Sequence, residues 1–245
     1  MMQLVIDIGN TRSRLAVFDK CDLKEMKLVP EITEELLSQT ISRFPAVRHG
    51  IISSVAGKEE HLSNHLFLNN VNTLILNDSM SLPFINNYET KKTLGNDRLA
   101  AVAGACLLYP KKNVLIFDAG TAITIDFKSA DEQYRGGNIS PGLAMRFKAL
   151  QQNTARLPLL EPDYKFSLLG RNTRDAIVSG VQQGILFEMN GYIETFEKQY
   201  PDIVVIMTGG DAPFFDNMLK KTIFVISDLT LSGLNYILRY NVETE

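Results

Sequence analysis

Two short turns, each with a carboxylate and a glycine between apolar runs, hold the residue types best suited to chemistry. The first reads DIGNT at residues 7–11, and the second reads DAGT at residues 118–121. Apolar runs around a short glycine-containing turn predict a β-hairpin. A carboxylate, a glycine that admits backbone N–H groups close to a ligand and a hydroxyl are what nucleotide phosphates and their cation require. The sequence therefore predicts a duplicated chain with one phosphate-binding hairpin in each half.

A third polar group, GNDR at residues 95–98, precedes an alanine- and leucine-rich segment that should be helical over residues 100–109. Asp97 near this helix start has two interpretations: a helix cap, or a group that orients or deprotonates an acceptor hydroxyl. Arg98 is suited to a bidentate pair with a substrate carboxylate. Because a helix N-terminus and an arginine favour the ionised carboxylate, we expect Asp97 mainly to orient the hydroxyl. Phosphoryl transfer depends mostly on such positioning.

These groups must be positioned by strands and helices of an α/β chain. Helical spacing of apolar residues, or a composition favouring helix, predicts helices over 31–44, 100–109, 173–200 and 229–240. Apolar runs predict strands over 50–55, 71–76 and 203–207 beside the two hairpins. Asn172 or Thr173 should cap the long helix. We expect two lobes, residues 1–112 and 113–245, each a mixed sheet with flanking helices.

Composition narrows the function classes. The net charge is −3, 22% of residues are charged and 45% are hydrophobic, and no basic stripe is present, so we expect small ligands and no nucleic-acid partner. Cys21 and Cys106 lack disulfide-type or metal-type spacing, which indicates reduced thiols in the cytoplasm. Neither a signal peptide nor a membrane-spanning run is evident, so we expect no membrane association.

His61 and His65 stand four residues apart, a spacing that can hold a metal ion on a helix. No third ligand is evident in the sequence. A solvated helix face is therefore the preferred interpretation of this pair.

The motifs DIGNT, GNDR, DAGT and TGGDA, in this order and in a chain of this length, resemble those of type III pantothenate kinases. That family belongs to the acetate and sugar kinase, Hsp70 and actin superfamily. The resemblance implies two ribonuclease H-like (actin-like ATPase) lobes and ATP-dependent phosphorylation of pantothenate to 4'-phosphopantothenate, the first step of coenzyme A biosynthesis. It also implies Mg²⁺, a monovalent cation (K⁺ or NH₄⁺) and a homodimer with active sites near the dimer interface.

The resemblance also implies roles for individual residues. ATP would be bound by Asp7, Ile8, Gly9, Asn10, Thr11, Arg12, Ser13, Arg14 and Thr121. Pantothenate would be bound by Tyr88, Gly95, Asn96, Asp97, Arg98 and Thr173, of which Tyr88 and Thr173 match by position more than by motif. Asp97 would be the catalytic base and Asp118 the ligand of the monovalent cation. Arg14 stands where the family often has lysine, and the two side chains present their charge differently.

Two alternative functions are compatible with the motifs. A kinase for another small hydroxylated substrate would use the same hairpins, because they fit any acceptor. A nucleotide-binding regulatory or accessory protein, for example in transcription, would keep the fold without kinase activity. The presence of Asp97, Arg98 and Asp118 favours an enzyme, and the GNDR segment favours pantothenate.

Overall fold

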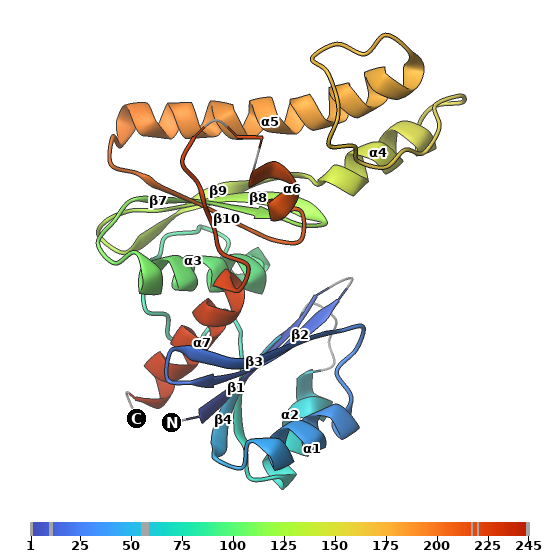
Figure 1. Ribbon diagram of the computed structural model, residues 1–245. Helices are drawn as coiled ribbons and strands as arrows, with labels where there is room; N and C mark the ends of the chain where they lie inside the picture. Colours follow the sequence, from blue (N-terminus) through green and yellow to red (C-terminus); the bar gives the residue numbers. More distant parts are fainter. Residues whose placement is uncertain (1, 10–11, 55–58, 217, 220, 244–245) are drawn as a thin grey trace. The chain divides into compact units, whose positions relative to one another are not determined.

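The computed structural model describes residues 2–9, 12–54, 59–216, 218–219 and 221–243 (Figure 1). The chain forms two compact units. Unit 1 comprises Met1–Pro110, Glu132–Tyr134 and Asp228–Glu245, and unit 2 comprises Lys111–Asp131 and Arg135–Ser227. The chain thus first leaves unit 1 close to the expected junction, but it returns there for a three-residue segment and again for its last helix.

Unit 1 contains a five-stranded sheet in the order β3-β2-β1-β4-β5. Its strands are β1 (Met2–Ile8), β2 (Ser13–Asp19), β3 (Asp22–Val29), β4 (Val47–Ser54) and β5 (Asn72–Ile75). Helices α1 (Glu34–Arg43) and α2 (Glu59–Leu68) pack on one face through a core that includes Leu4, Ile6 and Leu37. Alternate residues of a strand point to opposite faces, so Val5 is buried on the other face. There α7 (Leu229–Val242) contacts β1 and β4, and α3 (Asn96–Leu108) contacts β4.

Helices α3 and α7 lie side by side (Figure 1), and two glycines permit their close contact. A Cβ on Gly104 would overlap the carbonyl oxygen of Leu229, and one on Gly233 would overlap the carbonyl oxygen of Ala100. The backbones therefore approach at positions where no side chain fits. This contact explains why the last helix belongs to unit 1, although it was expected in the C-terminal half.

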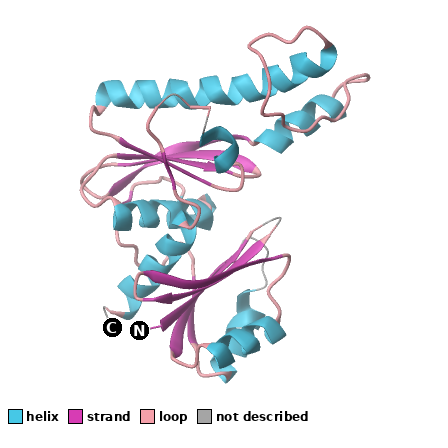
Figure 2. Cartoon of the chain, in the orientation of Figure 1, coloured by secondary structure: helices cyan, strands magenta, loops and turns pink. Residues whose placement is uncertain are grey.

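Unit 2 contains β7 (Val114–Ala119), β8 (Ala122–Lys128), β10 (Val204–Thr208), β11 (Phe224–Val225) and most of β9 (Gln133–Pro141), in the order β11-β10-β7-β8-β9. Its helices are α4 (Leu143–Gln152), α5 (Thr173–Gln199) and α6 (Ala212–Asp216). The long α5 runs along one face of the sheet (Figures 1 and 2), where Ile185 and Met189 join a core with Phe117 and Ile125. The helix predicted over residues 173–200 is thereby confirmed.

Strand β3 was not anticipated, because it is an edge strand with alternating charged residues and mostly exposed side chains, which weakens its pattern. Pro141 ends β9, and α4 begins two residues later at Leu143. Across the described residues, no helix combines the length and apolarity that crossing a membrane requires.

Candidate functional site

The first predicted hairpin is confirmed. Strands β1 and β2 pair antiparallel, with Ile8 opposite Ser13 and Asp7 opposite Arg14. The N–H of Gly9 donates to the carbonyl oxygen of Arg12 at 3.2 Å, so this N–H closes the turn itself. Two expected ATP-binding residues, Asn10 and Thr11, lie outside the described residues.

Arg14 is fixed by an ion pair at the base of this hairpin. Its Nη2 donates to Asp7 Oδ2 at 2.5 Å and to Thr230 Oγ1 at 2.6 Å, while its Nε donates to the same Asp7 oxygen at 3.1 Å. The charge of Asp7 is thus balanced within the protein, and Arg14 contacts Asp7 rather than extending alone toward solvent. Thr230 is buried on the first turn of α7, 216 residues away, and no local sequence signal indicated its role.

A cavity of about 770 Å³ lies beside the hairpin in unit 1. Its lining includes Ile8, Gly9 and Ser13 from the hairpin and His61 from α2. Oxygens of the Glu34 carboxylate lie 2.8 Å from His61 Nε2 and 3.4 Å from His65 Nδ1. Within the described part of the chain, no group of three or more His, Cys, Asp or Glu could hold a metal ion. His61 faces solvent, as expected of a solvated helix face, whereas His65 is half-buried.

The GNDR segment forms the start of α3, with Gly95 as the N-cap residue. The side chain of Asp97 is exposed, and its Oδ1 accepts a hydrogen bond from the N–H of Arg98 at 2.8 Å. This carboxylate folds back over Gly95, where a Cβ would overlap Asp97 Oδ1. Asn96 Nδ2 donates to the carbonyl oxygen of Leu76 at 3.1 Å, which fixes the turn before the helix. Asp97 is thus the second residue of α3 and not its cap, and one of its oxygens accepts a first-turn N–H while the side chain faces solvent.

Arg98 lies against two tyrosines. Its guanidinium carbon is 5.3 Å from the ring centroid of Tyr88 and 5.9 Å from that of Tyr134, and only 4% of the residue is exposed. The structure thus brings together two expected substrate-binding residues, Tyr88 and Arg98. Sequence reasoning missed Tyr134, because a single tyrosine in a strand carries no distinguishing signal.

The second predicted hairpin is also confirmed. Strands β7 and β8 pair antiparallel, with Asp118 opposite Thr124. The N–H of Gly120 closes the turn by donating to Ala122 O at 3.0 Å, and Thr121 is exposed at its tip. Asp118, the expected cation ligand, is half-buried at the end of β7.

A glycine loop at the end of β10 packs against Asp118. Gly209 has φ 95°, and a Cβ on it would lie 2.5 Å from Asp118 Oδ1, so only glycine suits this position. The N–H of Asp211 donates to Ala119 O at 2.8 Å, which ties the loop to the hairpin. Burial raises the pKa of the Asp211 carboxyl. Asp211 is thus a second carboxylate near the hairpin that was not expected to have a role.

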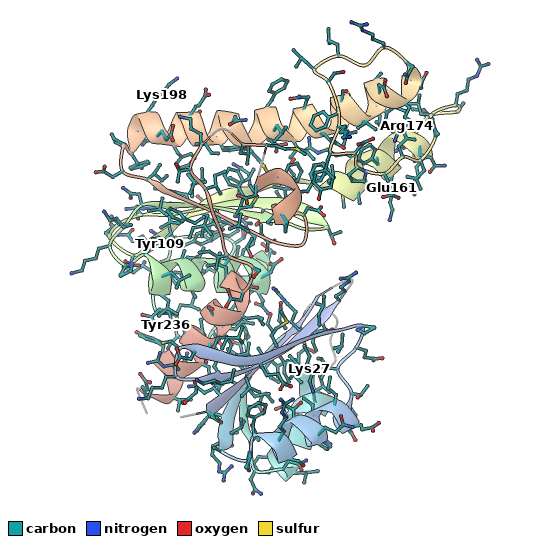
Figure 3. The ribbon with its side chains drawn as sticks, in the orientation of Figure 1. Lys27, Tyr109, Glu161, Arg174, Lys198 and Tyr236 are labelled. Atoms are coloured by element: carbon teal, nitrogen blue, oxygen red, sulfur yellow. The ribbon has the colours of Figure 1, made fainter. Side chains whose placement is uncertain are left out.

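Thr173, the remaining expected substrate residue, is the exposed first residue of α5 in unit 2, whereas Tyr88 and the GNDR segment belong to unit 1. The cap is Asn172, whose side-chain oxygen accepts from the N–H of Asp175 at 2.9 Å. Arg174, labelled in Figure 3, forms an ion pair with Asp163 at 3.3 Å. The start of α5 is therefore held by polar contacts of its own.

The whole chain resembles known proteins. A family model for type III pantothenate kinase matches residues 3–195. A protein of Christiangramia forsetii, called a type III pantothenate kinase, is 45% identical over 98% of this chain and 99% of its own length. Among solved structures, a Campylobacter jejuni protein named for the Baf family of transcriptional activators has a TM-score of 0.64 and 25% identity, covering 98% of this chain and 99% of that one. Glucokinase from an Antarctic psychrotroph has a TM-score of 0.53 and 12% identity, covering 98% and 99%. These structures confirm the expected α/β class and sugar-kinase-like fold.

Proposed function

The chain belongs to the type III pantothenate kinase family, whose reaction is the ATP-dependent phosphorylation of pantothenate, and we propose here which residues carry that reaction. The reaction opens coenzyme A biosynthesis. The observation that best supports the assignment is the start of α3. There the exposed carboxylate of Asp97 accepts the N–H of Arg98, and the Arg98 guanidinium lies against the Tyr88 ring. This arrangement offers a hydroxyl-orienting carboxylate beside a cation for the carboxylate of pantothenate.

Asp97 orients the primary hydroxyl of pantothenate. One carboxylate oxygen is occupied by the N–H of Arg98, which fixes the side chain and leaves the other oxygen to accept the hydroxyl proton. A weak base is sufficient, because the transition state of phosphoryl transfer is loose and proton removal comes late. Because the carboxylate is fixed before the substrate arrives, Asp97 acts mainly by positioning the hydroxyl.

Arg98 pairs with the carboxylate of pantothenate. Its burial lowers the local dielectric constant, so a charge pair there is stronger than one at the surface. Tyr88, whose ring centroid lies 5.3 Å from the Arg98 guanidinium carbon, is half-buried. Thr173 and the GNDR residues Gly95 and Asn96 complete the assignment of the substrate site.

The first hairpin binds the ATP phosphates, and the Asp7–Arg14 pair sets the charge at its base. The second hairpin contributes Thr121 to ATP and Asp118 to a monovalent cation, K⁺ or NH₄⁺. Because the described residues contain no cluster of three protein ligands, Mg²⁺ is held mainly by phosphate oxygens and water, with two carboxylates at most. Such cations, when bound, neutralise negative charge on the phosphates. The protein's own contribution is the fixed oxygen of Asp118 beside Gly209.

The protein is a cytoplasmic homodimer in this proposal. Unit 2 exposes large apolar side chains on and near α5, and Ile139, Leu168, Leu169 and Phe187 are each more than 60% exposed. Such side chains are typical of surfaces that a second copy covers. Neither Cys21 nor Cys106 is part of a disulfide, in keeping with a reducing compartment. Light scattering that gives the mass of a monomer would refute the dimer.

The test is ADP release from the purified protein with ATP and Mg²⁺, with and without pantothenate, in potassium and in sodium buffer. Pantothenate-dependent release that requires potassium supports the proposal. Asp97→Asn should abolish most turnover while ATP binding persists, and Asp118→Asn should remove the dependence on potassium. ADP release that ignores pantothenate but responds to another alcohol would instead support the alternative kinase. Binding of ATP without any transfer would support the regulatory alternative.

A further inference from the structure

The segment Glu132–Tyr134, which ends with the first two residues of β9, belongs to unit 1 and contacts the part of the chain that carries Tyr88. The rest of β9, from Arg135 onward, belongs to unit 2. The short strand β6 (Ile85–Asn86) pairs with them in parallel: the N–H of Ile85 donates to Glu132 O at 2.9 Å, and the N–H of Asn87 donates to Tyr134 O at 3.2 Å. These two bonds hold the backbone from Ile85 to Asn87.

Side-chain bonds extend this attachment up to Tyr88. Asn87 Nδ2 donates to Gln133 Oε1 at 2.7 Å. The N–H of Tyr88 donates to Asn86 Oδ1 at 3.0 Å, closing a turn just before the ring. The position of the Tyr88 backbone is therefore determined by the 132–134 segment.

The side chain of Tyr134, in the same segment, lies near both Tyr88 and Arg98. The rings of Tyr88 and Tyr134 are nearly parallel, at 7°, with centroids 6.0 Å apart. The guanidinium carbon of Arg98 lies 5.3 Å and 5.9 Å from the two centroids. Since the three separations are almost equal, the guanidinium lies beside the pair of rings rather than between them. Both ring faces attract the cation, and parallel rings attract each other when offset.

We propose that Tyr134 is a positioning residue of the pantothenate site, acting through Tyr88 and Arg98. Its residue exposure is 0%, so its ring cannot reach a substrate arriving from solvent. The ring instead packs beside Arg98, which limits the rotamers of that long side chain, and supports the face of Tyr88. This inference rests on the proposed assignment of Tyr88 and Arg98 to pantothenate. It predicts that Tyr134 contributes to the enzyme's preference for pantothenate, which carries a carboxylate, over an uncharged analogue.

The test compares four variants of the full chain: Tyr134→Leu, Tyr134→Phe, Arg98→Lys and the control Phe127→Leu. Phe127 is a buried ring of unit 2 with centroids of Phe196 and Tyr200 at 4.9 Å, so its loss removes similar aromatic contacts away from Arg98. The assay measures kcat and the KM values for pantothenate, for its uncharged alcohol analogue and for ATP. Thermal denaturation confirms that each variant is folded.

We expect Tyr134→Leu to raise the KM for pantothenate by about tenfold, the effect of two weakened ring contacts, with little change in kcat or in the KM for ATP. The KM for the alcohol analogue should change less, because it lacks the charge that Arg98 binds. Tyr134→Phe keeps the ring and should retain the wild-type preference for pantothenate over the alcohol analogue. Phe127→Leu should keep it as well.

Three outcomes separate this inference from the site assignment. If Arg98→Lys leaves the KM for pantothenate unchanged, the assignment of Arg98 is wrong, and the inference that rests on it is refuted too. If Arg98→Lys raises that KM but Tyr134→Leu changes it no more than Phe127→Leu does, only the inference is refuted. If Tyr134→Leu fails to fold, Asn87→Ala decides: it removes the exposed 2.7 Å bond to Gln133, and it should raise the same KM by a smaller factor. An unchanged KM in Asn87→Ala would then refute the inference.

Discussion

Replacing Gly95 by alanine should displace the carboxylate of Asp97 and slow phosphoryl transfer without unfolding the protein. The φ and ψ angles of Gly95, −61° and 136°, are open to alanine, so the backbone is not strained. The conflict is spatial, because the added Cβ would overlap Asp97 Oδ1, the oxygen that accepts from the N–H of Arg98. That oxygen must retreat by about 0.7 Å to restore an allowed contact in a closely packed turn.

The expected loss of activity follows from this displacement. A misplacement of about 1 Å in a reacting group costs roughly 100-fold in rate. For about 0.7 Å we expect kcat to fall by roughly 10- to 100-fold, which corresponds to about 1.4–2.7 kcal/mol of transition-state stabilisation. The KM for ATP should remain close to that of the wild type, since the first hairpin is unaffected. Thermal stability should fall by at most about 1 kcal/mol, because alanine is a weaker N-cap than glycine.

The assay is pantothenate-dependent ADP release by Gly95→Ala, Asp97→Asn and Gly191→Ala. Gly191 is exposed on α5, and an added Cβ there meets open space, so it serves as a matched control for the change from glycine to alanine. If Gly95→Ala retains wild-type kcat while Asp97→Asn loses it, the position of the carboxylate does not matter and the positioning argument fails. If Gly191→Ala is equally slow, the effect is not local to α3.

Further predictions concern the hairpin base, pH and helix packing. Thr230→Val keeps the buried shape but removes the oxygen that accepts from Arg14 at 2.6 Å, so the KM for ATP should rise by roughly three- to tenfold in steady-state kinetics. Burial raises the pKa of Asp211, so its ionisation weakens the folded state as pH rises through that raised value; Asp211→Asn should raise Tm at pH 7, and this gain should vanish below about pH 4, where the carboxyl is protonated in both states. Gly233→Ala places a Cβ 2.7 Å from the backbone nitrogen of Gly104 and should lower the free energy of unfolding by about 1–3 kcal/mol in denaturant titrations.

Local patterns determined much of the architecture. The hairpins around residues 7–11 and 118–121 follow from apolar runs separated by glycine-containing turns, and the structure pairs their strands as expected. The helix from Thr173 to Gln199 follows from its apolar spacing and from its Asn172 cap. These features depend on residues close together in the chain, so a local reading of the sequence is sufficient.

The GNDR motif was expected near the start of a helix, and α3 begins at Asn96. The motifs do not show which charged groups pair with one another inside the protein. Arg14 was expected at the ATP phosphates, and the structure shows it paired with Asp7 and Thr230. A pairing across strands depends on register as well as residue type.

Only the tertiary structure decided which distant residues complete these groups. Thr230 reaches Arg14 because α7 returns to unit 1, and α7 can do so because Gly104 and Gly233 let two helices approach without intervening side chains. Tyr134 reaches Arg98 because β6 pairs with the beginning of β9. Such contacts join residues tens to hundreds of positions apart, and they result from the packing of the entire chain rather than from any local preference.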